Sequence, residues 1–195
     1  MTIRLGLLCH ASTSATSSAA FPDDEPLDQV RRHKLAGVRH DLRHADRCWT
    51  SPALRAIQTT EALRLAAIPE PLLRDCDYGR WTGQSFDAVQ ADEPEALAEW
   101  LRNPAATPHG GESLLELMQR VADWLDSQTH GTGQVVAVTH ASVIRAAVIH
   151  ALGAPPPSFW RIDVAPLSLT RLTGDPGRWT LASIEPMTTR ALTAE

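Results

Sequence analysis

The chain has 195 residues, 43% of them hydrophobic, and a formal net charge of −5. This length suits one substantial core, so we expect residues 1–195 to form a single domain. The acidic balance disfavours a protein that holds nucleic acid or an anionic membrane through a generally basic surface.

The cysteines and the N-terminal segment bear on the compartment. Cys9, Cys48 and Cys76 are odd in number and have no Cys-x-x-Cys spacing, so neither a disulfide framework nor a common zinc site is indicated. The apolar run at residues 3–8 is shorter than a signal peptide, and no segment reaches the roughly 20 apolar residues of a membrane span. We therefore expect a cytoplasmic protein with free thiols.

The first half of the chain predicts strand–helix units. Residues 3–8 form an apolar run before a Ser/Thr-rich loop, which indicates a buried strand. Residues 27–42 have helical spacing, and a second strand is expected near residues 47–49. Ser51 and Pro52 are typical of a helix start, a cap followed by proline in the first turn, and predict a helix of about fifteen residues.

The second half continues the alternation. A short extended piece is expected at residues 72–78, and helices at residues 94–101, 112–125 and 142–152. Residues 134–139 are β-branched and continuously apolar, as in a central parallel strand. Three short strands are predicted near residues 160–164, 167–172 and 179–184. The pattern predicts an α/β protein, a three-layer α/β/α fold with a mostly parallel central sheet.

Three side chains follow predicted strands closely enough to converge. They are His10, Arg55 and His140, and ligands of open α/β sheets bind beyond the carboxyl ends of the strands. An arginine fork and protonated imidazole suit an anionic tetrahedral group, and an unprotonated imidazole nitrogen can attack phosphorus. The sequence therefore predicts a phosphate-type pocket.

Several segments resemble the motifs of the histidine phosphatase (phosphoglycerate mutase-like) superfamily. Residues 7–13, Leu-Leu-Cys-His-Ala-Ser-Thr, resemble Leu-x-Arg-His-Gly-x-Thr, and residues 51–59 are similar to Ser-Pro-x-x-Arg-Ala-x-Gln-Thr. Residues 73–83, 111–113 and 136–145 resemble three later motifs in the family's order, so the resemblance covers roughly residues 3–150. It implies a phosphoglycerate mutase-like fold and a phosphatase that works through phosphohistidine.

The resemblance also implies roles for individual residues. His10 would be the nucleophile, Arg55 and protonated His140 would hold phosphate oxygens, and Asp75 would protonate the leaving oxygen, with Asp77 in reserve. The remaining positions of the phosphate site fall on Cys9, Thr13 and Ala141. An acid role requires a raised pKa for Asp75, because an ordinary aspartate is ionised at neutral pH. No metal or other cofactor is required, the partner would be a small phosphorylated metabolite, and a homodimer stays open.

This chain departs from the family pattern around the phosphate. Cys9 stands where the family has arginine, Ala11 and Ala141 replace glycines, Thr16 replaces asparagine, and Asp75 replaces glutamate. Loss of one charged hydrogen bond weakens transition-state binding by roughly 10- to 100-fold. Four other arginines could supply a cation in its place: Arg39, Arg43, Arg145 and Arg161.

Other interpretations of single residues are weaker. Cys9 as nucleophile is disfavoured, because Ala15 stands where a Cys-x5-Arg motif needs arginine. His40 and His44 are four apart, but a solvated helix face is favoured over zinc. We expect Glu112 to line the pocket and the six tryptophans to serve packing.

Three functions stay open for this sequence. The first is a phosphatase acting on a small phosphorylated metabolite. The second is a non-catalytic phosphate binder, and the third is a mutase or another reaction in a remodelled pocket.

Overall fold

A six-stranded sheet forms the centre of the molecule in the computed structural model, which describes residues 2–36 and 41–187. The strands are β1 (Ile3–Cys9), β2 (Arg47–Thr50), β3 (Ile68–Pro69), β4 (Gly133–Thr139), β5 (Ser168–Asp175) and β6 (Arg178–Pro186). Their order is β3-β2-β4-β1-β5-β6, with β1 to β4 parallel and β5 and β6 antiparallel. The predicted mostly parallel sheet is confirmed.

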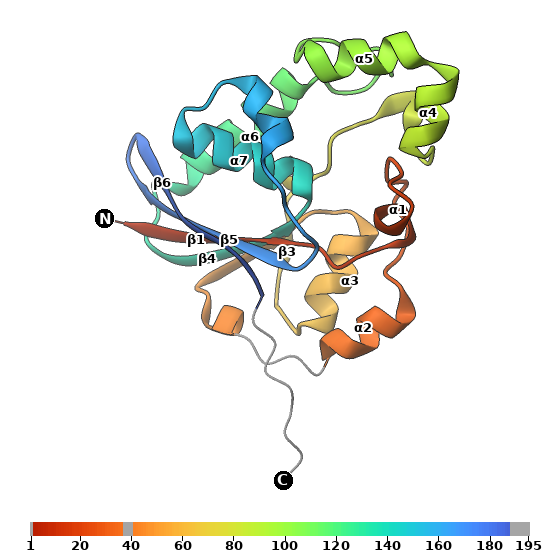
Figure 1. The fold of residues 1–195 in the computed structure, drawn as a ribbon. Coiled ribbons are helices and arrows are strands. Elements are labelled where there is room, and N and C mark those ends of the chain that lie inside the picture. Colours follow the sequence, from red (N-terminus) through yellow and green to blue (C-terminus); the bar gives the residue numbers. More distant parts are fainter. Residues whose placement is uncertain (1, 37–40, 188–195) are drawn as a thin grey trace.

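Helices cover both faces of this sheet, as Figure 1 shows. Helices α6 (Leu114–Gln128) and α7 (Ala141–Leu152) lie on one face, and α2 (Gln29–Ala36) and α3 (Leu54–Ala62) lie on the other. The short α1 (Ser14–Ser17), α4 (Phe86–Asp92) and α5 (Pro94–Arg102) lie beyond the strand ends. Four 3-10 turns complete the elements: Asp41–His44, Pro71–Leu73, Gly79–Trp81 and Pro156–Arg161. The three-layer α/β/α prediction is therefore confirmed.

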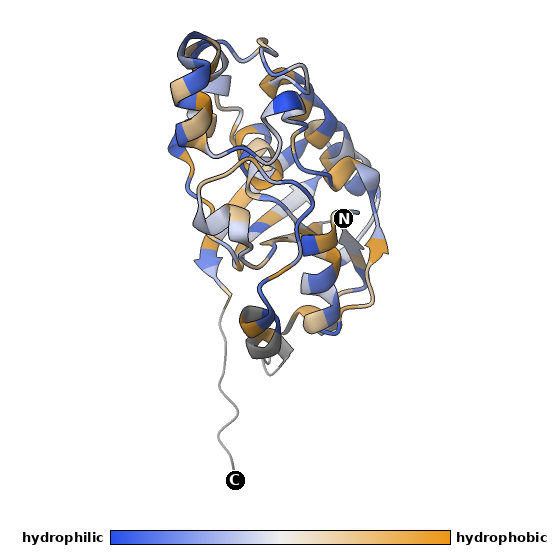
Figure 2. Cartoon of the chain, turned by 90° about the vertical axis from the view of Figure 1, so that its right-hand side faces the viewer, coloured by the Kyte–Doolittle hydropathy of each residue, from blue (hydrophilic) through white to orange (hydrophobic). Residues whose placement is uncertain are grey.

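The strands bury both faces because their side chains alternate between two cores. Leu5, Leu7 and Cys9 of β1 belong to the core under α6 and α7, whereas Leu8 belongs to the core under α3. The helices of Figure 2 carry both hydrophobic and hydrophilic residues, as expected when only one side of a helix is buried. Cys9 thus points to the α6–α7 side of the sheet.

The strand register brings three loop starts to one edge. Cys9 pairs with Thr139 between β1 and β4, and Thr50 pairs with Val138 between β2 and β4. The next residues continue the ladder, because His10 N donates to Thr139 O at 2.9 Å and Ser51 N donates to Val138 O at 2.8 Å. His10, Ser51 and His140 therefore emerge side by side.

Two expectations about local structure are wrong. Ser51 does not cap α3, which has only nine residues and begins after Ala53 without a side-chain cap. The Ser51 hydroxyl instead accepts from Ala53 N and bonds His140. Residues 156–161 form a 3-10 turn where a strand was expected nearby, because the fixed φ of consecutive prolines fits a tight turn better than a sheet ladder.

Two further findings concern helices. His40 lies outside the described residues and His44 is exposed in a 3-10 turn. None of the helices in residues 2–36 and 41–187 has the length and apolar character needed to cross a membrane.

Candidate active site

His10 begins the site at the end of β1. Its side chain is 8% exposed, and its ring centroid lies 5.1 Å from that of His140. Nδ1 lies 2.8 Å from the Ala11 carbonyl oxygen, which can only accept, so Nδ1 carries the proton and Nε2 keeps its lone pair. Burial lowers the pKa of His10 despite the opposing effect of the Ala11 hydrogen bond. His10 is therefore a neutral imidazole at pH 7 with Nε2 available for attack.

Arg55 supplies a buried positive charge from the first turns of α3. Its side chain is 4% exposed, and Nη2 donates to Asp75 Oδ2 at 2.8 Å. Nη1 lies 4.0 Å from Asp24 Oδ1, while Nε is buried with no hydrogen-bond partner. A buried, unpaired N–H is costly, and an anionic oxygen would satisfy it.

His140 faces His10 from the end of β4. Its Nε2 lies 2.7 Å from Ser51 Oγ, and its Nδ1 lies 3.3 Å from Asp75 Oδ2. Burial lowers the pKa of His140, and Asp75 does not offset this fully. His140 is thus neutral at pH 7 in this structure, and its protonated form beside a phosphate stays a prediction.

Asp75 is held ionised at the centre of a polar cluster. Its Oδ1 accepts from the Ser142 hydroxyl and from Cys76 N, while Oδ2 faces Arg55 and His140. Burial favours the neutral acid, but His140, Arg55 and Ser142 outweigh it and lower the pKa of Asp75 to about 2. Asp75 is therefore ionised in this structure, and the raised pKa that an acid role requires stays a prediction for the substrate complex.

The reserve acid, Asp77, does not join the cluster. It is exposed, and its Oδ1 accepts from Gly79 N at 2.9 Å, which fixes the turn that follows. Asp77 therefore serves the local backbone.

The other residues expected around a phosphate lie in the loop after β1 and at the start of α7. Thr13 caps α1, and its Oγ1 accepts from Thr16 N at 3.3 Å. Ala11 N donates to Thr59 Oγ1 at 3.1 Å on α3. Ala141 opens the 12-residue α7 directly after His140, where helix N–H groups favour an anion.

Sequence reasoning missed three participants. Ser51 and Ser142 bond His140 and Asp75, and their positions beside an expected helix start and beside His140 were the available signals. Glu25 lies in the loop between two prolines and has a buried Oε1 without a hydrogen-bond partner. Burial opposes its ionisation, but hydrogen bonds from Thr13 and the loop backbone lower its pKa, and its charge acts on His10.

Cys9 cannot act as an ionised nucleophile here. It is 2% exposed, and burial raises the pKa of its thiol to about 12. Among the four arginines considered, Arg39 lies outside the described residues, Arg161 is exposed, and the side chain of Arg43 is not described. Arg145 on α7 is half-buried, and its positive charge acts on Cys9. Of the four arginines, Arg145 is therefore the one whose described side chain is close enough to act on Cys9.

Glu112 supports the segment that leads to Asp75. Its two carboxylate oxygens accept from Arg120 at 2.8 and 2.7 Å, and one also accepts from Arg74. Arg120 in turn donates to the Leu72 and Arg74 carbonyls in the segment that leads to Asp75. Glu112 thus pairs with arginines just before α6, and its expected place in the lining of the pocket stays a prediction.

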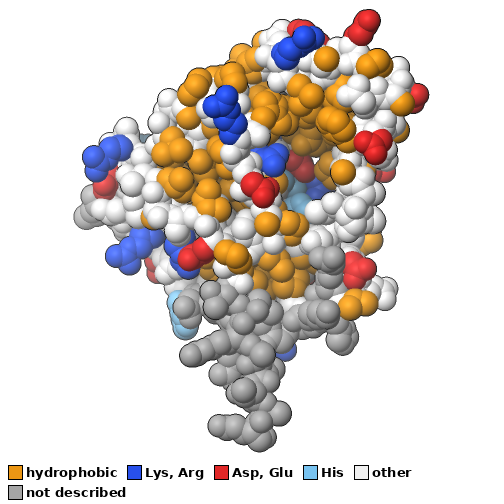
Figure 3. Space-filling view, viewed as in Figure 1, with side chains coloured by type: hydrophobic (Ala, Val, Ile, Leu, Met, Phe, Trp, Pro, Cys, Tyr) orange, Lys and Arg blue, Asp and Glu red, His pale blue; other side chains and the backbone are white. Residues whose placement is uncertain are grey.

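Four of the six tryptophans show two different roles. Trp81 and Trp124 are fully buried packing residues, as expected. Trp100 and Trp160 instead line a cavity beside the site. The space-filling view in Figure 3 shows a hollow with charged and histidine side chains on its floor and hydrophobic side chains around it.

The comparisons with known proteins agree with this geometry. The family model of the histidine phosphatase superfamily (branch 1) matches residues 5–185. The chain is 30% identical over 137 residues to phosphoserine phosphatase 1 of Hydrogenobacter thermophilus, covering 67% of this chain and 65% of that protein. It is also 30% identical over 126 residues to glucosyl-3-phosphoglycerate phosphatase of Mycobacterium tuberculosis, covering 60% of this chain and 53% of that protein. The matches thus span less than two thirds of these curated relatives.

A solved structure gives the same fold over nearly the whole length. The alpha-ribazole phosphatase of Shigella flexneri superposes with a TM-score of 0.80 at 18% identity, covering 96% of this chain and 98% of that one. At this identity the likeness establishes the fold alone.

Proposed function

Because this chain belongs to the histidine phosphatase superfamily (branch 1), we propose that it hydrolyses a small phosphomonoester through a phosphohistidine on His10. The observation that carries the proposal is the pairing of a neutral His10, whose Nε2 is free, with a buried Arg55, whose Nε lacks a partner. One group attacks phosphorus and the other holds its oxygens. The curated relatives named above are phosphatases, which supports the reaction class.

The first step transfers the phosphoryl group to the protein. His10 Nε2 attacks phosphorus, the bond to the ester oxygen breaks, and the electron pair leaves with that oxygen. Arg55 and the N-terminal N–H groups of α7 hold the non-bridging oxygens. Water then attacks the phosphohistidine, which releases phosphate and restores His10.

Phosphate binding changes the protonation of the two groups beside His10. A phosphate dianion next to His140 favours its charged form, so we infer that His140 takes up a proton when substrate binds. The same dianion competes for Arg55, the partner that holds Asp75 ionised, and thereby raises the pKa of Asp75. Asp75 then becomes able to protonate the leaving oxygen.

The proposed substrate class and compartment are inferred from the burial of the site, the net charge and the cysteines. We infer a small phosphorylated metabolite as partner, since the side chains of His10, Arg55 and His140 are buried and the chain carries a net charge of −5. We place the reaction in the cytoplasm because the three cysteines are free in this structure.

Phosphate release from a substrate panel tests the proposal. The panel contains O-phosphoserine, glucose 6-phosphate, ethyl phosphate, benzyl phosphate and 4-nitrophenyl phosphate, and His10→Ala should lower kcat/KM at least about 1,000-fold. Binding of inorganic phosphate without turnover of any ester would favour the non-catalytic binder. Conversion of an ester into its positional isomer would favour the mutase.

A further inference from the structure

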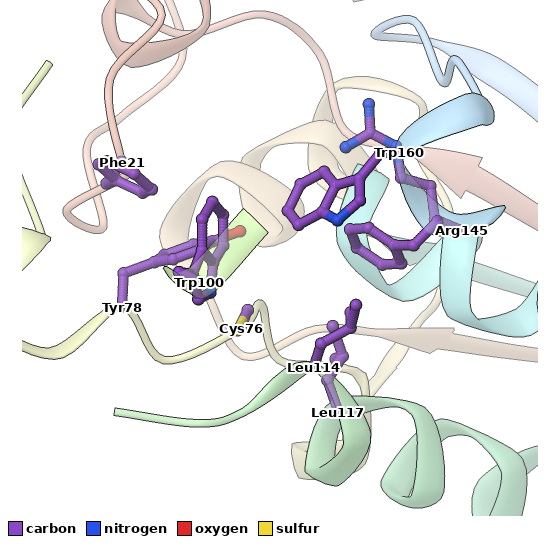
Figure 4. A pocket seen from close by; sticks show the side chains of 9 residues that line it. Phe21, Cys76, Tyr78, Trp100, Leu114, Leu117, Arg145 and Trp160 are labelled. Atoms are coloured by element: carbon purple, nitrogen blue, oxygen red, sulfur yellow. The ribbon is translucent and has the colours of Figure 1, made fainter. Parts of the chain in front are cut away.

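A partly enclosed cavity of about 100 Å³ lies beside the active site. Figure 4 shows aromatic side chains from several segments around it: Phe21 from the loop after α1, Tyr78, Trp100 from α5, and Trp160 from the last 3-10 turn. Phe159 and Arg145 also line the cavity. Five of the nine lining side chains are therefore aromatic.

The cavity adjoins the reacting groups. Cys76 lines it and directly follows Asp75, whose carboxylate faces Arg55 and His140. Cys9, the residue before His10, belongs to the same core cluster as Cys76 and Phe159. The cavity therefore lies beside the two segments that carry His10 and Asp75, within reach of the ester group of a substrate.

The exposure of Trp160 indicates that the cavity is a ligand site and not part of a closed core. Trp160 is 37% exposed, although its ring lies 4.8 Å from Trp100 and 4.9 Å from Phe159 between centroids. A tryptophan at the rim of a cavity can pack against a bound ring while the buried core stays unchanged. A cavity of about 150 Å³ holds benzene in a protein interior. This cavity is smaller, about 100 Å³, but it is partly open, so a single ring can enter it with one edge at the opening.

The polar side chains of the lining limit the chemical class of a ligand that the cavity can bind. Arg145 uses Nε to bond the Ile162 carbonyl at 2.8 Å, and its guanidinium carbon lies 5.6 Å from the Phe159 centroid. Its Nη atoms make no hydrogen bond to another described residue. The polar groups of the lining are those of Tyr78, Arg145 and the Cys76 thiol and the indole N–H groups of Trp100 and Trp160. No carboxylate or amide side chain is among them, so the lining is poorly suited to pair the several hydroxyls of a sugar.

Resting on the proposed phosphatase function, we propose that the aromatic cavity binds the leaving group of the substrate and that this group carries one flat aromatic ring. The ring would pack against Trp100 and Trp160 while Arg145 faces it as a cation. The substrate class is thus an aromatic phosphomonoester with its ring close to the ester oxygen.

Competing primary-alcohol esters test this assignment. Benzyl phosphate should have a kcat/KM at least about tenfold above that of ethyl phosphate, because its additional ring is buried on binding. Trp160→Ala should lower this ratio about tenfold. Phe86→Ala is the matched control, since Phe86 is also 37% exposed but lies on α4 outside the lining, and it should keep the ratio.

The outcomes separate this proposal from the function on which it rests. A benzyl-to-ethyl ratio near one, or a ratio that Trp160→Ala leaves unchanged, would overturn the aromatic assignment. Glucose 6-phosphate as the best substrate, with the same loss in Trp160→Ala, would overturn it in favour of a sugar. If no ester is turned over, benzylphosphonate binding tighter than methylphosphonate, lost in Trp160→Ala, would support the cavity while the phosphatase function fails.

Discussion

Cys9 and His10 are neighbours whose side chains meet different surroundings. Cys9 still follows the alternation of β1 and points into the core under α6 and α7, whereas His10 lies past the strand and faces His140. The thiol is therefore buried and protonated, and the imidazole is neutral and free at Nε2. Substitution of His10 should therefore abolish activity, whereas substitution of Cys9 should change activity little.

Replacing Cys9 by alanine should leave kcat/KM within about threefold, because the thiol neither ionises nor carries a charge to phosphate. His10→Ala, assayed beside it with 4-nitrophenyl phosphate, should lose at least about 1,000-fold. Equal losses in the two variants would show that the thiol takes part in the chemistry.

Asp75→Asn should affect esters according to how much their leaving oxygen needs a proton. We expect a loss of about 100-fold or more in kcat for ethyl phosphate and less than about tenfold for 4-nitrophenyl phosphate, whose phenolate departs unprotonated. Asp77→Asn is the control, because the exposed Asp77 side chain accepts from Gly79 N and does not join the Asp75 cluster. Equal losses for both esters in Asp75→Asn would assign Asp75 to positioning Arg55 and His140.

The sequence predicted a site residue's location correctly where that residue directly follows a strand. His10 and His140 could be predicted to meet because each follows a strand, and parallel neighbours end at one edge. The protonation of Asp75 could not be predicted, because it depends on Arg55, His140 and Ser142, which are 20 to 67 residues away along the chain.

At the scale of elements, the segment carrying Asp75 is held against the loop before α6. Glu112 N donates to Asp77 O at 2.8 Å, and Arg80 N donates to His109 O at 3.0 Å. Gly111 permits this approach, since a Cβ there would lie 2.1 Å from Asp77 O. The backbones of residues 77–80 and 109–112 are therefore in contact at Gly111, where there is no space for a Cβ atom.

Gly111→Ala should therefore lower the free energy of unfolding by more than about 2 kcal/mol and reduce kcat, because the backbone near Asp75 must shift. Gly110→Ala is the matched control: its φ is +80°, but a Cβ there would meet nothing within 4 Å. That variant should cost only about 1 to 2 kcal/mol of conformational strain and keep kcat. Urea unfolding and steady-state assays measure both, and similar effects in the two variants would contradict the contact.

The types of the elements were largely predictable because apolar residues form continuous runs in buried strands and recur every three to four residues in amphipathic helices. The start of α3 was not, because the Ser51 hydroxyl bonds His140, which is 89 residues away along the chain. The aromatic cavity also escaped prediction, since it joins residues from five or more separate segments of the chain.

At the scale of the whole molecule, two buried neutral histidines make stability depend on pH. Burial lowers the pKa of His10 and His140 in the folded chain, so the unfolded chain binds more protons below about pH 6.5. The free energy of unfolding should therefore fall as pH falls from 7 toward 4, by up to about 1.4 kcal/mol per pH unit for each histidine.

Urea unfolding at several pH values measures this slope. His10→Gln should reduce the slope by about one proton's contribution. A flat profile between pH 7 and 4 would contradict the neutral, buried state of both rings.

The phosphohistidine itself is the most direct test of the proposed chemistry. The protein is mixed with 4-nitrophenyl phosphate, quenched in base and digested, and the peptides are analysed by mass spectrometry. We predict one phosphoryl group on His10, attached at Nε2 because Nδ1 is engaged with the Ala11 carbonyl, and none in His10→Ala. Phosphate release without any label on His10, or a label on another residue, would contradict it.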